Sequence, residues 1–133
     1  MSPIILDTSA VAAVIFGESD AEAYAAAMVR HAGELSISAV TLVELGIVAE
    51  ARQGPAATQD VRALLDRLGV VTEPVDAAQA GAALAAWRRF GKGRHPAGLN
   101  LGDCFSYALA RMSGGSLLFK GNDFAQTDIV GAL

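Results

Sequence analysis

The stretch ILDTSAV, residues 5–11, decides the fold, because it joins an apolar run to a helix-like run through a single carboxylate. PIIL (3–6) has the length and composition of a short buried strand, and TSAVAAVIFG (8–17) is typical of a helix that a glycine closes. Asp7 stands between the two. An acid at this position can cap the helix, accept a phosphate or bind a metal, and each interpretation predicts different residues elsewhere.

Apolar strands and helices alternate along the rest of the chain. We expect strands at 3–6, 35–38, 69–75, 116–120 and 127–130, and helices at 8–17, 19–33, 41–54, 55–68, 76–90 and 100–114. Five short apolar strands that alternate with helices predict a parallel sheet covered on both faces. A chain of 133 residues has the length of one domain, so we expect residues 1–133 to form a single unit.

Composition excludes several classes of protein. The chain is 53% hydrophobic and 18% charged, which excludes intrinsic disorder and leaves room for an apolar surface that meets a partner. The net charge of −4 argues against nucleic-acid binding through the overall field, and the single cysteine, Cys104, excludes an internal disulfide. No apolar run is long enough to span a membrane, and no basic segment precedes PIIL, so we expect a cytoplasmic protein without a membrane role.

Four acids lie where helices are expected to begin: Asp7, Glu44, Asp103 and Asp123. Each has a simple structural explanation. Asp7 can cap the helix from Thr8, and Asp123 can cap a turn. Thr41 and Glu44 have capping-box spacing, while Asp103 falls in the first turn after an asparagine.

The joint placement of the acids favours a second explanation. Asp7, Glu44 and Asp123 follow strands at the carboxyl edge of the expected sheet, where open α/β sheets bind ligands, and the helix of Asp103 approaches the same edge. Gathered carboxylates repel one another unless a divalent cation neutralises them, and a set without histidine or cysteine favours Mg²⁺ or Mn²⁺. Such a site suits phosphodiester hydrolysis, because a bound ion lowers the pKa of a water molecule.

Four blocks carry a resemblance to a known family: ILDTSAV (5–11), TLVELGIV (41–48), GLNLGDCFSYALA (98–110) and LLFKGNDFAQTDI (117–129). In their order and spacing they resemble PIN-domain ribonucleases, specifically the VapC-like toxins of toxin–antitoxin pairs. The resemblance implies a three-layer α/β/α sandwich with a central, mostly parallel five-stranded sheet. It also implies Mg²⁺-dependent endonuclease activity on RNA, tRNA or rRNA in particular, a homodimer, and inhibition by a VapB-type antitoxin.

The resemblance also assigns roles to residues. Asp7 and Asp103 match the principal metal-binding aspartates, Glu44 matches a glutamate that binds directly or through water, and Asp123 matches a more variable fourth acid. Ser9 would orient Asp7, and Asn100 is a polar neighbour without a fixed role. Asp128 is a spare acid, and we prefer Asp123 because it directly follows the turn at 120–122. One or two metal ions remain compatible with this set.

The loop WRRFGKGRHPAG, residues 87–98, gathers the cations Arg88, Arg89, Lys92 and Arg94. They can hold an RNA backbone, with Trp87 or Phe90 stacking on a base, or they can be a solvated helix end with both rings in the core. His95 is expected to be a loop residue. Lys120 can bind phosphate or pair with a neighbouring acid.

Two other functions fit parts of the sequence. A receiver-type phosphotransfer domain needs an acceptor aspartate after the third strand, where only Asp76 is available, at a helix start. A phosphatase of the haloacid dehalogenase type needs a second aspartate at the position that Ser9 fills. A non-catalytic PIN-like module that binds RNA or protein is the remaining alternative, and the presence of all four acids argues against it.

Overall fold

Four short parallel strands form the centre of the chain in the computed structural model, which describes residues 2–133. They are β1 (Ile4–Leu6), β2 (Leu35–Ser38), β3 (Val71–Glu73) and β4 (Ser116–Leu118), in the order β3-β2-β1-β4. The chain runs outward from β1 to β2 and β3, and then returns to add β4 on the other side of β1. The strand order therefore reverses between β1 and β4, which is where α/β sheets place their ligand sites.

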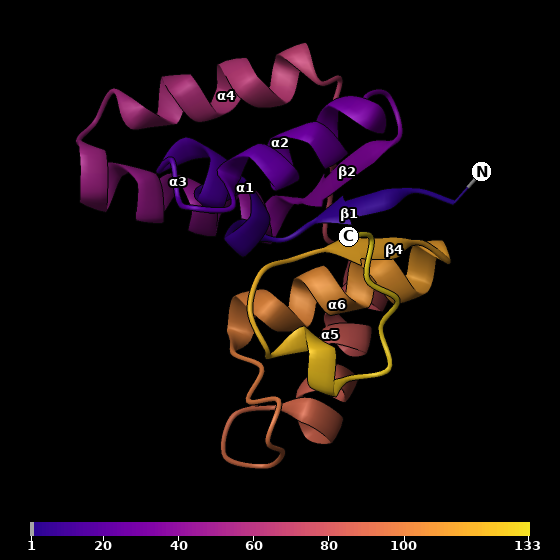
Figure 1. The fold of residues 1–133 in the computed structure, drawn as a ribbon. Coiled ribbons are helices and arrows are strands. Elements are labelled where there is room, and N and C mark those ends of the chain that lie inside the picture. Colours follow the sequence, from indigo (N-terminus) through magenta and orange to yellow (C-terminus); the bar gives the residue numbers. More distant parts are fainter. Residues whose placement is uncertain (1) are drawn as a thin grey trace.

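Helices cover both faces of the sheet (Figure 1). The core consists of two apolar clusters, one on each face of the sheet. Ile4 and Leu6 of β1 pack into the cluster formed with the helices between residues 8 and 67. Ile5 packs into the cluster formed with the helices between residues 77 and 113. This alternation gives the three-layer α/β/α arrangement that we predicted. The helices of the first cluster are α1 (Thr8–Ile15), α2 (Ala21–Arg30), α3 (Ala39–Gln53) and α4 (Ala57–Arg67), and those of the second are α5 (Ala77–Phe90) and α6 (Leu101–Ser113).

The prediction of a fifth strand at 127–130 is wrong. On the side of β4 away from β1, the described chain forms only an isolated bridge between Leu117 and Gly131. Side-chain hydrogen bonds hold this segment in another shape: the Thr127 hydroxyl donates to the Phe124 carbonyl and accepts from the Ile129 amide. A short 3₁₀ turn, η1 (Phe124–Gln126), precedes it. The apolar residue Ile129, which contributed to the strand prediction, instead packs against the core from an irregular segment.

Two of the acids, Glu44 and Asp123, do not form the caps that the sequence allowed. Asp7 accepts from the Ser9 amide and so caps α1, as predicted. Asn100 and Asp103 form the expected capping box at the start of α6. The box expected from Thr41 and Glu44 is wrong, because α3 begins two residues earlier and Ser38 caps it. The carboxylate of Glu44 is therefore free of any capping role. None of the described helices is long and apolar enough to cross a lipid bilayer.

Candidate active site

Asp7 ends β1 at the point where the strand order reverses, and three donors fix its carboxylate. Its Oδ2 accepts from the amide of Ser9 at 3.0 Å and from the Ser9 hydroxyl at 2.6 Å. Its Oδ1 accepts from the Ser106 hydroxyl at 2.8 Å, and Ser106 lies 3.0 Å from the Thr41 hydroxyl. Asp7, Thr41 and Ser106 are all buried. The hydrogen bond expected from Ser9 is thus present, and Asp7 is held in one orientation.

Glu44 approaches the same place from α3. Its Oε1 accepts a hydrogen bond from the hydroxyl of Thr8, the residue that follows Asp7. Its carboxylate lies so close to the Cα of Gly102 that a Cβ on that residue would overlap it. Gly102 is in the first turn of α6, where backbone N–H groups favour an anion. The absence of a side chain at 102 therefore admits Glu44 to the start of α6, next to Asp103.

The other three acids act electrostatically on Asp103. The pKa of its carboxyl is raised from 3.8 to about 7, chiefly by burial, and the negative charges of Asp7, Glu44 and Asp123 raise it further. The hydrogen bond that its Oδ2 accepts from the Asn100 amide, 3.1 Å long, acts in the opposite direction. An acid whose charged form is disfavoured by burial and by three other carboxylates is a candidate for cation binding.

The four side chains are not arranged as a closed metal cage. Within residues 2–133, no three acidic, histidine or cysteine side chains are close enough together to hold an ion. The expected convergence within the reach of one metal is therefore absent from this conformation. The hydrogen bonds explain why: Asp7 is turned toward Ser9 and Ser106, Glu44 toward Thr8, and Asp103 toward Asn100. Asp123, exposed at the start of η1, makes no side-chain cap.

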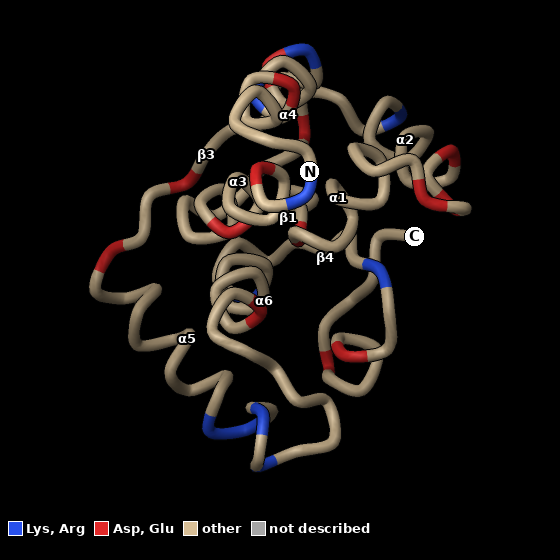
Figure 2. Tube along the Cα trace, turned by 90° about the vertical axis from the view of Figure 1, so that its left-hand side faces the viewer, with Lys and Arg blue, Asp and Glu red and all other residues tan. Residues whose placement is uncertain are grey.

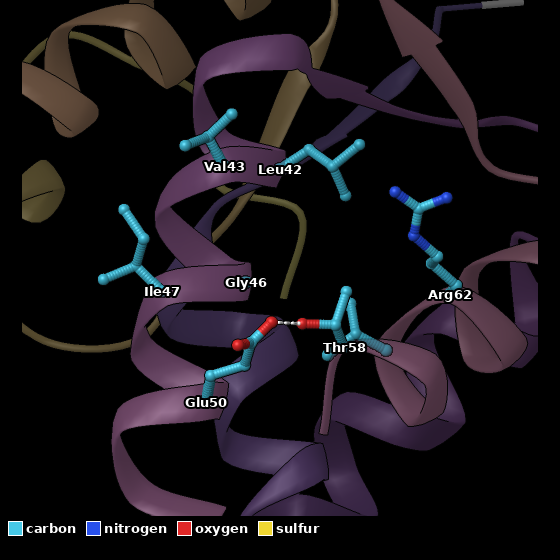
Figure 3. Close-up of a pocket in the computed structure, with 8 residues that line it drawn as sticks. Leu42, Val43, Gly46, Ile47, Glu50, Thr58 and Arg62 are labelled. Carbon is cyan, nitrogen blue, oxygen red and sulfur yellow. Dashed lines mark hydrogen bonds between the residues drawn. The ribbon is translucent and has the colours of Figure 1, made fainter. Parts of the chain in front are cut away.

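An apolar hollow opens beside the acids. It has a volume of about 760 Å³ and is lined by α3, by the segment after β3 and by the start of α6, with Glu44, Asn100 and Gly102 on its wall. A second hollow, of about 310 Å³, lies between α3 and α4 (Figure 3). There Glu50 accepts from Thr58. None of the four acids lines the second hollow, so the first is the one connected with the candidate site.

The cations of the 87–98 loop are exposed, and two of them are engaged. Figure 2 shows them at the end of α5 and in the loop that follows. Arg89 pairs with Asp128 at 3.0 Å, and Arg94 lies over the Trp87 ring, 4.8 Å from its centroid. Within residues 2–133, Arg88 and Lys92 take part in no ion pair.

The two aromatic rings near this loop differ in burial. Phe90 is 5% exposed and lies in the core, so it is not available to stack on a base. Trp87 is exposed, so the alternative that places both rings in the core is wrong for Trp87. His95 packs its ring edge on Phe90 and accepts from the Ala97 amide, which confirms it as a loop residue. Cys104 is buried.

The two remaining candidates have structural partners. Lys120 pairs with Glu18 and Asp20, the second of the two roles that the sequence allowed. Asp128 accepts from the Tyr107 hydroxyl and pairs with Arg89, so it is held against α5 and α6. Asp123, and not Asp128, is the acid whose charge acts on Asp103.

Three residues that support the acids were not predicted: Thr8 and Ser106, which donate to Glu44 and Asp7, and Thr41, which contacts Ser106. Thr8 is adjacent to Asp7 in the sequence, which was a usable signal. Ser106 was recognisable only as one hydroxyl in an otherwise apolar stripe of α6, where it lies among buried residues. Thr41 had been assigned to a helix cap.

Comparison with known proteins identifies the family and the fold of the chain. Residues 4–130 match the PIN domain family. The chain is 48% identical over 126 residues to VapC ribonuclease Mb0640 of Mycobacterium bovis, covering 95% of each protein. Among solved structures, Mycobacterium tuberculosis VapC20, described as a sarcin-ricin loop cleaving toxin, superposes with a TM-score of 0.79 at 22% identity over 96% of both chains. VapBC2 from Rickettsia felis, bound to a DNA fragment from its promoter, gives 0.74 at 14% identity and covers 96% of both chains.

The two solved structures show that the fold is shared. Because residues 4–130 match the PIN domain family, this protein belongs to that family. Within that family, its identity to named VapC ribonucleases places it among the VapC-like ribonuclease toxins.

Proposed function

We propose that the chain is a Mg²⁺-dependent endoribonuclease toxin, neutralised by a VapB-type antitoxin. The observation that carries this proposal is the group of four carboxylates near the point where the strand order reverses. The charges of Asp7, Glu44 and Asp123 contribute to the raised pKa of Asp103. The 48% identity to a VapC ribonuclease supports RNA as the substrate. Mn²⁺ is a chemically reasonable substitute for Mg²⁺ at an all-oxygen site.

The residues present fit a divalent cation. All four candidate ligands, Asp7, Glu44, Asp103 and Asp123, offer carboxylate oxygens. The pKa of Asp103 is raised chiefly by burial and further by the charges of the other three acids, and a bound cation would offset both effects. Rotation of Glu44 away from Thr8 and of Asp103 away from Asn100 would turn their oxygens toward an ion beside Asp7, which keeps its position. A bound ion would supply charge stabilisation at the scissile phosphate and a water molecule of lowered pKa.

The chain's own residues then have distinct tasks. Ser9 and Ser106 hold Asp7 from both of its oxygens, so that its position is set before a cation arrives. Gly102 admits Glu44 beside Asp103. The exposed cations Arg88 and Lys92 are available to contact RNA phosphates. No side chain is required as a nucleophile.

Protein partners are supported by the surface of α3 and α6. Val43, Ile47 and Leu101 are 62%, 65% and 75% exposed, and all three line the hollow beside the acids. Exposed apolar surface of this kind marks interaction sites. It supports an antitoxin that reaches the site, as well as a homodimer. The Rickettsia felis structure contains VapB together with VapC, which supports the same class of partner here.

Incubation with RNA tests the proposal. We expect the purified chain to cut total RNA, with tRNA and rRNA as the first substrates to examine, in the presence of Mg²⁺ and not with EDTA. Products should be resolved on denaturing gels and their ends mapped. RNA binding without cleavage would instead favour a non-catalytic PIN-like module, and phosphorylation of an aspartate by acetyl phosphate would favour a receiver.

The pKa of Asp103 predicts how stability depends on pH. Because the folded chain binds this proton more tightly than the unfolded chain, the contribution is fully present below about pH 4 and is lost as the pH rises through about 7. The metal-free protein should therefore lose stability over this window. Mg²⁺ should restore it, with a larger rise in melting temperature at about pH 8 than at about pH 5.

Thermal unfolding with EDTA or Mg²⁺ across this pH range checks the expectation. Asp103→Asn serves as the control, since it should flatten the difference between the two pH values. An equal effect of Mg²⁺ at both pH values would contradict the assignment of Asp103 to the cation site.

A further inference from the structure

We propose that Lys120 is a positioning residue that fixes the edge of the active site through Glu18 and Asp20, and does not bind substrate phosphate. This inference rests on the proposed function, since it assigns Lys120 a role in the same nuclease site. It concerns the segment that leaves β4 and leads to Asp123. The contacts of that segment come from three different parts of the chain.

The peptide unit between Phe119 and Lys120 is held from both sides. Its carbonyl oxygen, on Phe119, accepts a hydrogen bond of 2.9 Å from the hydroxyl of Tyr24, a buried residue of α2. Its N–H, on Lys120, donates to the Ser9 hydroxyl at 3.0 Å. The same Ser9 hydroxyl donates to Asp7 Oδ2 at 2.6 Å. The orientation of this peptide is therefore coupled directly to the orientation of Asp7.

The side chain of Lys120 anchors the same peptide to the turn between α1 and α2. Its Nζ donates to Glu18 Oε1 at 2.7 Å and to Asp20 Oδ1 at 2.9 Å. Asp20 occupies the N-cap position of α2 but makes no cap hydrogen bond there. Its carboxylate is instead committed to a lysine 100 residues away in the sequence. Two acids on one ammonium leave little positive charge for an RNA phosphate.

The position of Asp123 depends on this anchor. It lies three residues beyond Lys120, after Gly121, whose φ of 102° allows the chain to turn sharply. Loss of the anchor would release the start of this turn, together with the hydrogen bond to Ser9. Two of the four acids, Asp7 and Asp123, would then lose part of their support. Partners of this kind typically change metal affinity or activity by about 10–100-fold when removed.

Lys120→Met tests the inference, because methionine keeps an unbranched apolar chain and removes the charge. We expect kcat to fall about tenfold or more and half-saturation to need more Mg²⁺, with the KM for RNA nearly unchanged. Exposed ion pairs add little to stability, so the melting temperature should change only slightly. Lys92→Met is the matched comparison: as an exposed lysine available to phosphate, it should raise KM and leave kcat nearly unchanged.

The double variant Glu18→Gln, Asp20→Asn distinguishes the two roles of Lys120, because each role predicts a change in a different kinetic constant. If the acids anchor Lys120, their neutralisation should lower kcat as Lys120→Met does. If Lys120 binds phosphate, freeing it should lower the KM for RNA, and that result would overturn the proposal. Unchanged kinetics in both variants would overturn it as well.

A measurement without metal or RNA separates this inference from the proposed function. Hydrogen exchange of the metal-free protein should be faster at residues 119–123 in Lys120→Met, and also in Tyr24→Phe, which removes the donor to Phe119 and keeps the ring. Tyr24→Phe carries the test if Lys120→Met does not fold. Unchanged exchange in both would overturn the anchor even if the wild type cuts RNA. Faster exchange in a protein that cuts no RNA would instead leave the anchor standing and refute the nuclease.

Discussion

Asp7→Asn is expected to reduce Mg²⁺-dependent RNA cleavage by about a thousandfold or more, because a metal ion supplies several kcal/mol of transition-state stabilisation. Asp7 is the most buried of the four acids, and both of its oxygens are oriented by hydroxyl donors. Asparagine keeps the shape and one carbonyl oxygen, but it removes the negative charge. The hydroxyls of Ser9 and Ser106 can accept from its amide group as well as donate, so the fold should persist.

Single-turnover cleavage measures the expected loss of activity in Asp7→Asn, and far-ultraviolet circular dichroism checks that its fold persists. Asp60→Asn is the matched control, since Asp60 is exposed on α4, outside the candidate site. It should cleave like the wild type. Retention of cleavage in Asp7→Asn, in a protein shown to be free of contaminating nuclease, would contradict the role given to this carboxylate.

Gly102→Ala is expected to lower RNA cleavage while it leaves the melting temperature nearly unchanged. A Cβ at this position would overlap the Glu44 carboxylate, which is the mobile end of a long side chain and can swing away at small cost. Alanine is also the better helix former, by up to about 1 kcal/mol relative to glycine. We therefore expect a protein of nearly unchanged melting temperature in which Glu44 is displaced from Asp103. Cleavage and Mg²⁺ affinity should fall by about 10–100-fold, as for other changes that move a ligand's support.

Gly81→Ala provides the matched control, because Gly81 lies inside α5 and a Cβ there meets nothing within 4 Å. It should raise the melting temperature slightly and leave cleavage unchanged. Equal activity of Gly102→Ala and Gly81→Ala would show that the position of Glu44 does not matter. Unfolding of Gly102→Ala would show instead that the Glu44 carboxylate cannot move.

The layers of the fold could be predicted because each strand is a local apolar run between helix signals. ILDTSAV contains the end of β1, the cap and the start of α1, and all three are found in the structure. The segment at 127–130 is different, because its conformation depends on distant partners. Asp128 is held by Tyr107 and Arg89, 21 and 39 residues away, and no local pattern reveals such contacts.

The same distinction applies to the candidate site. The four acids were recognisable because each follows a strand or begins a helix, and topology brings such positions to one edge. Their orientations were not, because Ser106 reaches Asp7 across 99 residues of sequence and Thr8 reaches Glu44 across 36. Lys120 shows most clearly that partners distant in the sequence could not be predicted, since the sequence allowed either phosphate or an acid as its partner. Only the folded chain brings Glu18 and Asp20 to it.

Cleavage by this chain, as we propose it, depends on the binding of one or two divalent cations by Asp7, Glu44, Asp103 and Asp123. A crystal structure of the chain soaked with Mn²⁺, with anomalous differences recorded at the manganese edge, measures this most directly. We predict a peak between Asp7 and Asp103, with manganese–oxygen distances of about 2.0–2.2 Å and with Glu44 or Asp123 as a further ligand, directly or through water. A peak only at Glu18 and Asp20, or no peak at saturating Mn²⁺, would contradict the account.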